Sequence, residues 1–177
     1  YVYSGLETKQ KVSEENPLKP NHNFGIAKSF FEQFILKNHP QSVIFRLSSV
    51  FGPGHAKNPN TILNFVKECR EKGEITLWGL GKRKIQYVYL KDVINCALKS
   101  FDLKPGIYNL GGDDYISVAD AARSIASFYQ AKTTFLKDKP EGETLPFLDN
   151  NKLKTALKKN LFTPFATALI EYLNEIA

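Results

Sequence analysis

Short apolar segments of strand length alternate with helical segments along this chain of 177 residues. The expected strands cover 1–3, 42–47, 75–78, 86–90, 107–110 and 133–136. The expected helices cover 24–38, 61–72, 92–101, 117–129, 151–158 and 164–176. This alternation predicts an α/β fold with a largely parallel sheet, because parallel strands need long crossover connections that are usually helical.

Capping residues mark the ends of several expected helices. Asn60 precedes helix 61–72 as an N-cap, and Gly73 follows it as a C-terminal stop. Ser117 and Asp120 have the spacing of a capping box, and we expect Asp92 to cap the helix that it begins. Residues 5–23 are polar and contain prolines, so we expect a long surface loop there.

The helix expected at 24–38 carries more apolar residues than one helical stripe can hold. They are Ile26, Phe30, Phe31, Phe34, Ile35 and Leu36. We therefore expect this helix to be buried on two sides, either by a sheet and a second helix or by a partner subunit.

Composition limits the classes of function that remain. The net charge of +6 is compatible with an anionic partner, but the lysines are scattered and no nucleic-acid-binding module is recognisable. No apolar run is long enough to span a membrane, and the first residues do not form a signal peptide, so we expect a cytoplasmic protein. The chain opens with Tyr1 inside an expected strand, which predicts further residues before it.

Cysteine and histidine spacing gives no indication of a metal site. Cys69 and Cys96 lie in expected helices without a CxxC pattern, and we interpret them as unreactive, buried or half-buried thiols. His22, His39 and His55 lie in loops without ligand spacing, so we expect no metal.

Three segments have features beyond those of a generic fold. In the first, Phe24 and Lys28 are four residues apart and share one face of a helix. In the second, the strand ending at Leu47 runs into the Gly52-Pro53-Gly54 turn, and ligands of α/β proteins bind beyond the carboxyl ends of strands. The third, 78–92, places aromatic and basic residues around a glycine turn.

Several short motifs occur in order along nearly the whole chain. They are Val2-Tyr3, Glu14 with Pro17 and Pro20, Phe24 to Lys28, Arg46 to Gly54, Gly79 to Asp92, Tyr108 to Gly112, and Asp149 with Lys152. In this order they resemble the extended short-chain dehydrogenase/reductase superfamily, and within it the sugar-nucleotide epimerases and dehydratases. Phe24 to Lys28 falls on that family's Tyr-x-x-x-Lys motif, so Phe24 stands where the family has its catalytic tyrosine.

The resemblance implies the C-terminal part of a Rossmann-type doubly wound sheet together with a smaller substrate-binding α/β subdomain. Residues 1–55 would complete the dinucleotide-binding domain, and 56–177 would form mainly the substrate subdomain, with the chain exchanging between them near 80–110. The implied activity is transient hydride transfer between bound NAD or NADP and a nucleoside-diphosphate sugar. The resemblance also implies a homodimer through helix 24–38. The glycine-rich turn that binds the cofactor's pyrophosphate has no counterpart in this sequence.

The resemblance also assigns individual site residues. Lys28 would hold the nicotinamide ribose, whereas Phe24 has no proton to exchange. The remaining implied cofactor contacts are Leu47 and Ser49, and the implied substrate contacts are Tyr3, Ser49, Thr61, Ile62, Trp78 and Arg83. This sequence departs from the family at Ser49 for Asn, Phe51 for Tyr, Ile85 for a phosphate-binding Arg, and Gln86 for Asp.

These departures leave alternatives open. The chain is either an active enzyme or a catalytically silent sugar-nucleotide or cofactor-binding protein, and its basic charge gives weak support to nucleic-acid binding. Trp78 is either a nucleotide-stacking residue or a half-buried strand residue. Arg83 either replaces the lost arginine at Ile85 or is simply exposed.

Overall fold

Parallel strand pairs join distant parts of the chain in the computed structural model, which describes residues 1–7, 11–54, 59–158 and 160–177. Three pairs are purely parallel: β2 (Val43–Leu47) with β6 (Gly106–Leu110), β4 (Glu74–Trp78) with β8 (Lys132–Leu136), and β1 (Lys11–Val12) with β9 (Phe147–Leu148). The central strand β5 (Lys84–Tyr89) pairs in parallel with β3 (Ser49–Phe51) and antiparallel with β7 (Tyr115–Ser117). The predicted α/β class with mostly parallel strands is confirmed.

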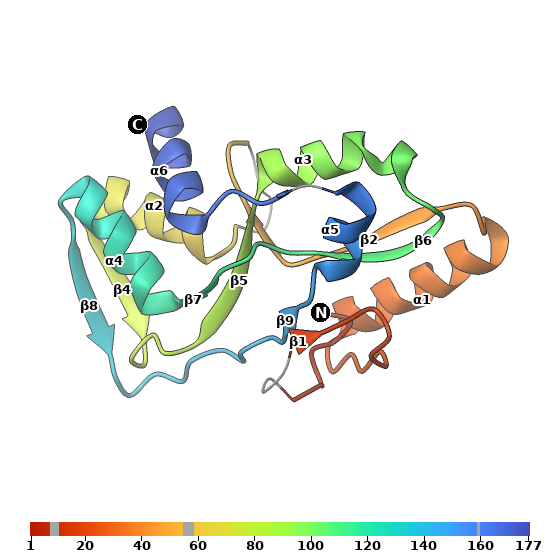
Figure 1. The fold of residues 1–177 in the computed structure, drawn as a ribbon. Helices are drawn as coiled ribbons and strands as arrows, with labels where there is room; N and C mark the ends of the chain where they lie inside the picture. The colour runs from red at the N-terminus through yellow and green to blue at the C-terminus, as the bar shows by residue number, and fades with distance from the viewer. Residues whose placement is uncertain (8–10, 55–58, 159) are drawn as a thin grey trace.

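Six α-helices connect these strands in the described parts of the chain. They are α1 (Asn23–Asn38), α2 (Thr61–Lys72), α3 (Leu90–Leu98), α4 (Val118–Tyr129), α5 (Asn151–Leu157) and α6 (Phe165–Ile176), and the short 3-10 helix η1 (Ser100–Asp102) follows α3. Figure 1 shows α1 and α3 on opposite sides of the β2–β6 pair, whereas α2, α4 and α6 gather near β4 and β8, with β5 running between the two groups. No helix in these parts has the length and apolar character needed to cross a membrane.

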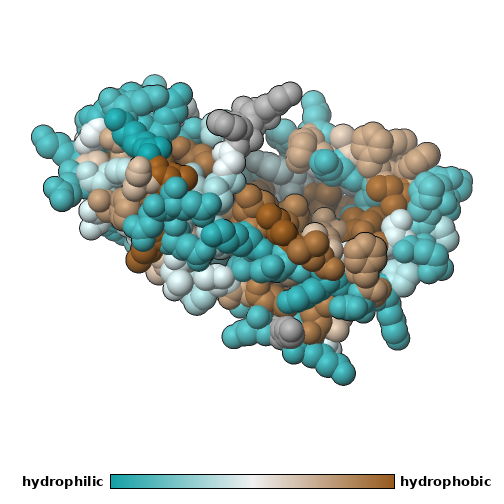
Figure 2. Space-filling model, turned by 90° about the horizontal axis from the view of Figure 1, so that it is seen from above, coloured by the Kyte–Doolittle hydropathy of each residue, from teal (hydrophilic) through white to brown (hydrophobic). Residues whose placement is uncertain are grey.

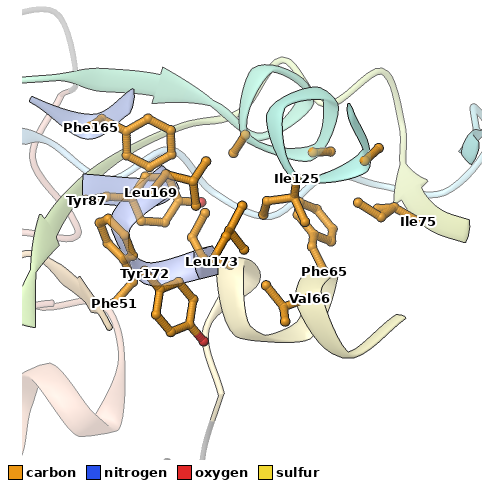
Figure 3. Packing of buried hydrophobic residues seen from close by; sticks show 14 of the residues in the cluster. Phe51, Phe65, Val66, Ile75, Tyr87, Ile125, Phe165, Leu169, Tyr172 and Leu173 are labelled. Atoms are coloured by element: carbon orange, nitrogen blue, oxygen red, sulfur yellow. The ribbon is translucent and has the colours of Figure 1, made fainter. Parts of the chain in front are cut away.

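The largest core lies among α2, α4, α6 and the strands β4 and β5. Figure 3 shows Phe65 and Val66 of α2 facing Ile125 of α4 and Leu173 of α6. A second cluster, which includes Leu110 of β6 and Leu153 of α5, lies on the α3 side of the β2–β6 pair (Figure 1). Each cluster buries apolar side chains from segments far apart in sequence, which is the main favourable term in folding.

The cap residues of α2 and α4 act as expected. The Asn60 side chain accepts a hydrogen bond from the Leu63 backbone N–H at 3.2 Å, and Gly73 ends α2 with a left-handed φ of 65°. The Ser117 hydroxyl accepts one from the Asp120 N–H at 3.0 Å. Both side chains satisfy helix N–H groups that otherwise lack a partner.

Asp92 does not cap a helix, so this prediction is wrong. It lies inside the first turn of α3, which begins at Leu90. Its buried carboxylate instead accepts hydrogen bonds from the N–H and hydroxyl of Thr163, at 2.8 and 3.0 Å. These bonds tie α3 to the segment before α6, a long-range contact that local sequence does not reveal.

Residues 1–3 form a turn, and the strand expected there is absent. Val2 and Tyr3 are nevertheless buried, because they pack against Val12 and Leu148 of the β1–β9 pair. Gly25 at the start of α1 lies against this turn, and a Cβ at that position would be 2.6 Å from the Tyr1 carbonyl oxygen. The glycine therefore allows α1 to approach the turn closely.

The apolar surface of α1 is not covered by the described residues, so the first of the two alternatives, a sheet and a second helix, is not seen in the parts of the chain that the structure describes. Phe30 is 64% exposed and Phe34 is 52% exposed, whereas only Gly25 and Glu32 of this helix are buried. The buried Glu32 side chain of this helix bonds Arg46 of β2.

A second apolar surface lies on α3 and η1. Figure 2 looks down on this side of the molecule and shows hydrophobic residues gathered over the half that holds α3. Leu98 is 70% exposed and Phe101 is 93% exposed. This surface is on the opposite side of the β2–β6 pair from α1 (Figure 1).

Candidate functional site

A cavity of about 330 Å³ opens beyond the carboxyl end of β2. Its wall is formed by the turn at residues 1–4, the end of β2, the start of α2, the strand β5 and the segment before β9. This is the position at which open α/β sheets bind ligands. The cavity is therefore the candidate site.

Five of the residues assigned to the site by resemblance line this cavity. They are Tyr3, Leu47, Ser49, Thr61 and Arg83. Four others do not line this cavity. Ile62 is fully buried in the core beneath α2, and Trp78 is 59% exposed at the end of β4, more exposed than the half-buried strand residue we considered. Phe24 and Lys28 are exposed on α1.

The cavity wall contains polar atoms without a partner among the described residues. The buried Ser48 hydroxyl and the buried Nε of Arg83 have no hydrogen bond there. Buried polar groups are normally paired, so these two atoms are exceptions among the residues that line the cavity. Ser48 was not singled out from the sequence, although it lies between the two assigned residues Leu47 and Ser49.

The Tyr3 hydroxyl faces a polar network inside the protein. It lies 3.1 Å from the Ser13 carbonyl oxygen and 3.3 Å from Asn109 Oδ1, and it accepts a hydrogen bond from Arg46. Burial raises the pKa of Tyr3, and the nearby Arg46 charge opposes this rise without cancelling it. Tyr3 thus forms part of the cavity wall through its ring, while its hydroxyl is hydrogen-bonded within the protein.

A buried ion pair anchors α1 to β2. Arg46 Nε and Nη2 donate to the two carboxylate oxygens of Glu32 at 2.8 and 2.6 Å. The side chains are 7% and 4% exposed. This bidentate geometry is the strong form of a charge-assisted hydrogen bond. The pair therefore holds the helix that carries Phe24 and Lys28 against the strand that ends at the cavity.

Phe24 and Lys28 are neighbours on the first turns of α1, as their spacing predicts. The Lys28 ammonium nitrogen lies 5.2 Å from the centre of the Phe24 ring. His22 Nδ1 caps the helix by accepting a hydrogen bond from the Phe24 N–H at 3.1 Å. The cap fixes the start of the helix and with it the backbone positions of both residues.

Gln86 and Ile85, two of the departures from the family pattern, have structural roles here. Gln86 is buried, its Nε2 donates to the carbonyl oxygens of Gly112 and Leu148, and its Oε1 accepts from the Leu148 N–H. An ionised aspartate could accept but not donate these bonds. Ile85 packs into the core and also lines the cavity, where Arg83 is the basic side chain of this turn.

The parallel strand pairs and the cavity beyond β2 define the Rossmann-like α/β class. Within that class, the family model described as the NAD dependent epimerase/dehydratase family matches residues 1–111. The chain belongs to the NAD dependent epimerase/dehydratase family.

Individual relatives are similar at moderate identity. The spore coat polysaccharide biosynthesis protein SpsK of Bacillus subtilis is 28% identical over 136 residues, which cover 77% of this chain and 46% of the relative. The solved ADP-L-glycero-D-manno-heptose-6-epimerase of Helicobacter pylori has a TM-score of 0.86 at 21% identity, over 99% of this chain and 57% of that one. The UDP-glucose 4-epimerase of Thermus thermophilus, solved with NAD, has a TM-score of 0.84 at 17% identity. The match covers 98% of this chain and 60% of that one.

The chain spans about half the length of the curated relatives that it matches. The solved structures establish the Rossmann-like fold for this chain. The division at residue 55 stays a prediction, and residues 55–58, including His55, lie outside the described parts.

Proposed function

We propose that this protein is an NAD(P)-dependent epimerase or dehydratase that acts on a nucleoside-diphosphate sugar. The observation that carries the proposal is the cavity beyond β2, which gathers Tyr3, Leu47, Ser49, Thr61 and Arg83 from separate segments. Membership of the family supports the reaction class. A nucleotide sugar brings a negative diphosphate, and Arg83 offers a guanidinium with a partnerless buried Nε at the cavity wall.

The residues around α1 and β2 fit a nicotinamide cofactor. Lys28 is exposed at the start of α1, and the partnerless Ser48 hydroxyl lies next to Leu47 at the end of β2. Lys28 would hold the ribose, while Leu47 and Ser49 would line the nicotinamide side of the cavity. When bound, the cofactor would accept a hydride from a sugar carbon. The solved Thermus thermophilus relative is a complex with NAD, which supports this assignment.

The proton transfer that accompanies hydride transfer finds no base at Phe24 or Tyr3, although the phenol of Tyr1 also lines the cavity. Phe24 lacks a hydroxyl, and the Tyr3 hydroxyl is engaged by Arg46 and by the Ser13 carbonyl oxygen. This observation favours a second candidate, a sugar-nucleotide or cofactor-binding protein that has lost catalysis. Ser48 and Ser49 remain near the cavity as hydroxyl groups, but an unactivated serine is a weak base.

Two further parts of the proposal concern assembly and location. We propose a homodimer through α1, because its exposed phenylalanines form an apolar surface that water disfavours. The proposed cytoplasmic location rests on the sequence alone.

One experiment separates the two candidates. The protein is mixed with NAD and then with UDP-glucose, UDP-galactose, dTDP-glucose or a GDP-sugar, while the absorbance of reduced nicotinamide is followed. Appearance of the reduced cofactor, or of a converted sugar by chromatography, supports the enzyme. Binding of a sugar nucleotide in calorimetry without any conversion supports the silent binding protein, and absence of both contradicts the proposal.

A further inference from the structure

The turn between β4 and β5 is held in place by a carboxylate from a distant part of the chain. Glu141 Oε1 accepts a hydrogen bond from the Leu80 N–H at 2.9 Å, and Oε2 accepts one from the Arg83 N–H at 2.6 Å. These backbone hydrogen bonds, chiefly the one from Arg83, lower the pKa of Glu141. The carboxylate therefore stays ionised and bound to the turn at neutral pH.

The local backbone is shaped for this contact. Gly79 and Gly81 have φ values of 65° and 66°, a left-handed conformation that points successive N–H groups to one side. A Cβ on Gly79 would lie 2.5 Å from Glu141 Cγ, so the glycine also makes room for the carboxylate. The turn is thus an anion-binding concavity occupied by the protein's own side chain.

Glu141 belongs to an extended strap, residues 137–146, that lies between β8 and β9 without regular structure beyond one turn. The strap is fixed at its far end, where the Tyr115 hydroxyl donates to the Leu145 carbonyl oxygen at 2.7 Å. Leu145 and Pro146 form part of the cavity wall. The segment that holds the turn therefore also encloses the candidate site.

Arg83 lies where the strap, the turn and the cavity meet. Its backbone N–H is bound by Glu141, and its guanidinium passes so close to Gly142 that a Cβ there would lie 2.7 Å from Nη1. The side chain continues to the cavity wall, and it forms no ion pair with any described residue. The strap thus restricts the conformations that the Arg83 side chain can adopt.

We propose that Glu141 is a positioning residue that fixes the Gly79–Arg83 turn and thereby aims Arg83 at the diphosphate of the substrate. This inference rests on the proposed function, since it assumes a nucleoside diphosphate in the cavity. A guanidinium that is already held in its binding orientation loses less side-chain conformational freedom when the ligand binds. The fixed orientation of Arg83 would therefore increase the affinity for the diphosphate. Glu141 itself does not line the cavity, so it would act through Arg83.

The test measures dissociation constants by calorimetry for UDP, GDP and dTDP and for their nucleosides. Glu141→Ala should weaken the best-bound diphosphate roughly tenfold, comparable to the loss of a hydrogen bond to a charged group, and should leave its nucleoside unchanged. Glu141→Gln keeps one acceptor oxygen, so its affinity for the diphosphate should fall less than that of Glu141→Ala. Glu143→Ala is the matched control, because this carboxylate on the same strap bonds Asn21 rather than the turn, and it should bind as the unaltered protein does.

A double-mutant cycle with Arg83→Ala tests the coupling. Because Glu141 acts through Arg83, adding Glu141→Ala to Arg83→Ala should cause little further loss of diphosphate binding. Additive losses, an equal loss for the nucleoside, or unchanged binding by Glu141→Ala would each overturn the positioning role and leave the proposed function standing. Tighter binding would also overturn it, because the carboxylate would then compete with phosphate for the turn. If the unaltered protein binds no nucleoside diphosphate, both proposals fail.

Discussion

The ammonium nitrogen of Lys28 lies 5.2 Å from the centre of the Phe24 ring, on the adjacent turn of α1. A hydroxyl added to this ring would enter the field of a positive charge, which favours the ionised form of a phenol. Phe24→Tyr should therefore create or raise hydride-transfer activity in the full-length protein, by about 10² to 10⁴-fold if proton transfer limits the rate.

The measurement is the rate of sugar-nucleotide conversion with saturating NAD. Phe31→Tyr is the matched control, because it adds the same hydroxyl to another exposed phenylalanine of α1. If the unaltered protein already converts the sugar nucleotide rapidly and Phe24→Tyr does not raise the rate, the base lies elsewhere. The missing hydroxyl at position 24 then does not limit catalysis.

Lys28→Ala should weaken NAD binding to the full-length protein. The change removes a charged donor to the ribose, and such a hydrogen bond is worth roughly 1.5 to 3 kcal/mol, or about 10- to 150-fold in the dissociation constant. Fluorescence titration with NADH measures it. Lys37→Ala, in the last turn of the same helix, should leave the constant unchanged. An unchanged constant for Lys28→Ala would make Lys28 an ordinary surface lysine.

Glu32→Gln should destabilise the fold, because it removes the negative partner of a buried arginine. Loss of one member of a buried ion pair costs about 3 to 5 kcal/mol in the free energy of unfolding. Urea unfolding followed by circular dichroism measures the loss. Glu71→Gln is the comparison, since the Lys67–Glu71 pair is exposed and exposed pairs contribute about 1 kcal/mol or less. Equal losses in the two variants would contradict the structural importance of the Glu32–Arg46 pair.

Phe30→Glu should shift the proposed homodimer toward the monomer. Phe30 is 64% exposed on α1, and a buried unpaired charge at a subunit interface is strongly unfavourable. Light scattering at micromolar concentration measures the molar mass. Phe101→Glu places the same charge on the apolar surface of η1 and should leave the mass unchanged. A monomeric unaltered protein would rule out the dimer at that concentration.

Local signals in the sequence were sufficient for much of the fold. The side chains of Asn60 and Ser117 mark the starts of α2 and α4 because an N-cap acts within three residues of its own position. The strand β2 could be predicted because its apolar run has strand length and ends shortly before a glycine turn.

Other parts depend on contacts between distant residues. The run Tyr1-Val2-Tyr3 has strand composition, but its burial comes from Val12 and Leu148, and it forms a turn. Asp92 is of a residue type that often caps helices, but its carboxylate accepts a hydrogen bond from Thr163. The role of Glu141 could not be predicted at all, because its acceptor function depends on a turn about 60 residues earlier in the chain.

The polar contacts around Arg46 have a thermodynamic consequence for the two proposed ligands. Glu32 on the helix of Lys28, Arg46 on β2, and Tyr3 at the cavity wall are joined in one continuous chain of hydrogen bonds. A ligand that displaced the Tyr3 ring would therefore strain the contacts that hold α1. If binding at the cavity and binding at α1 are coupled through these contacts, linkage requires each of the two proposed ligands to alter the affinity of the other by the same factor.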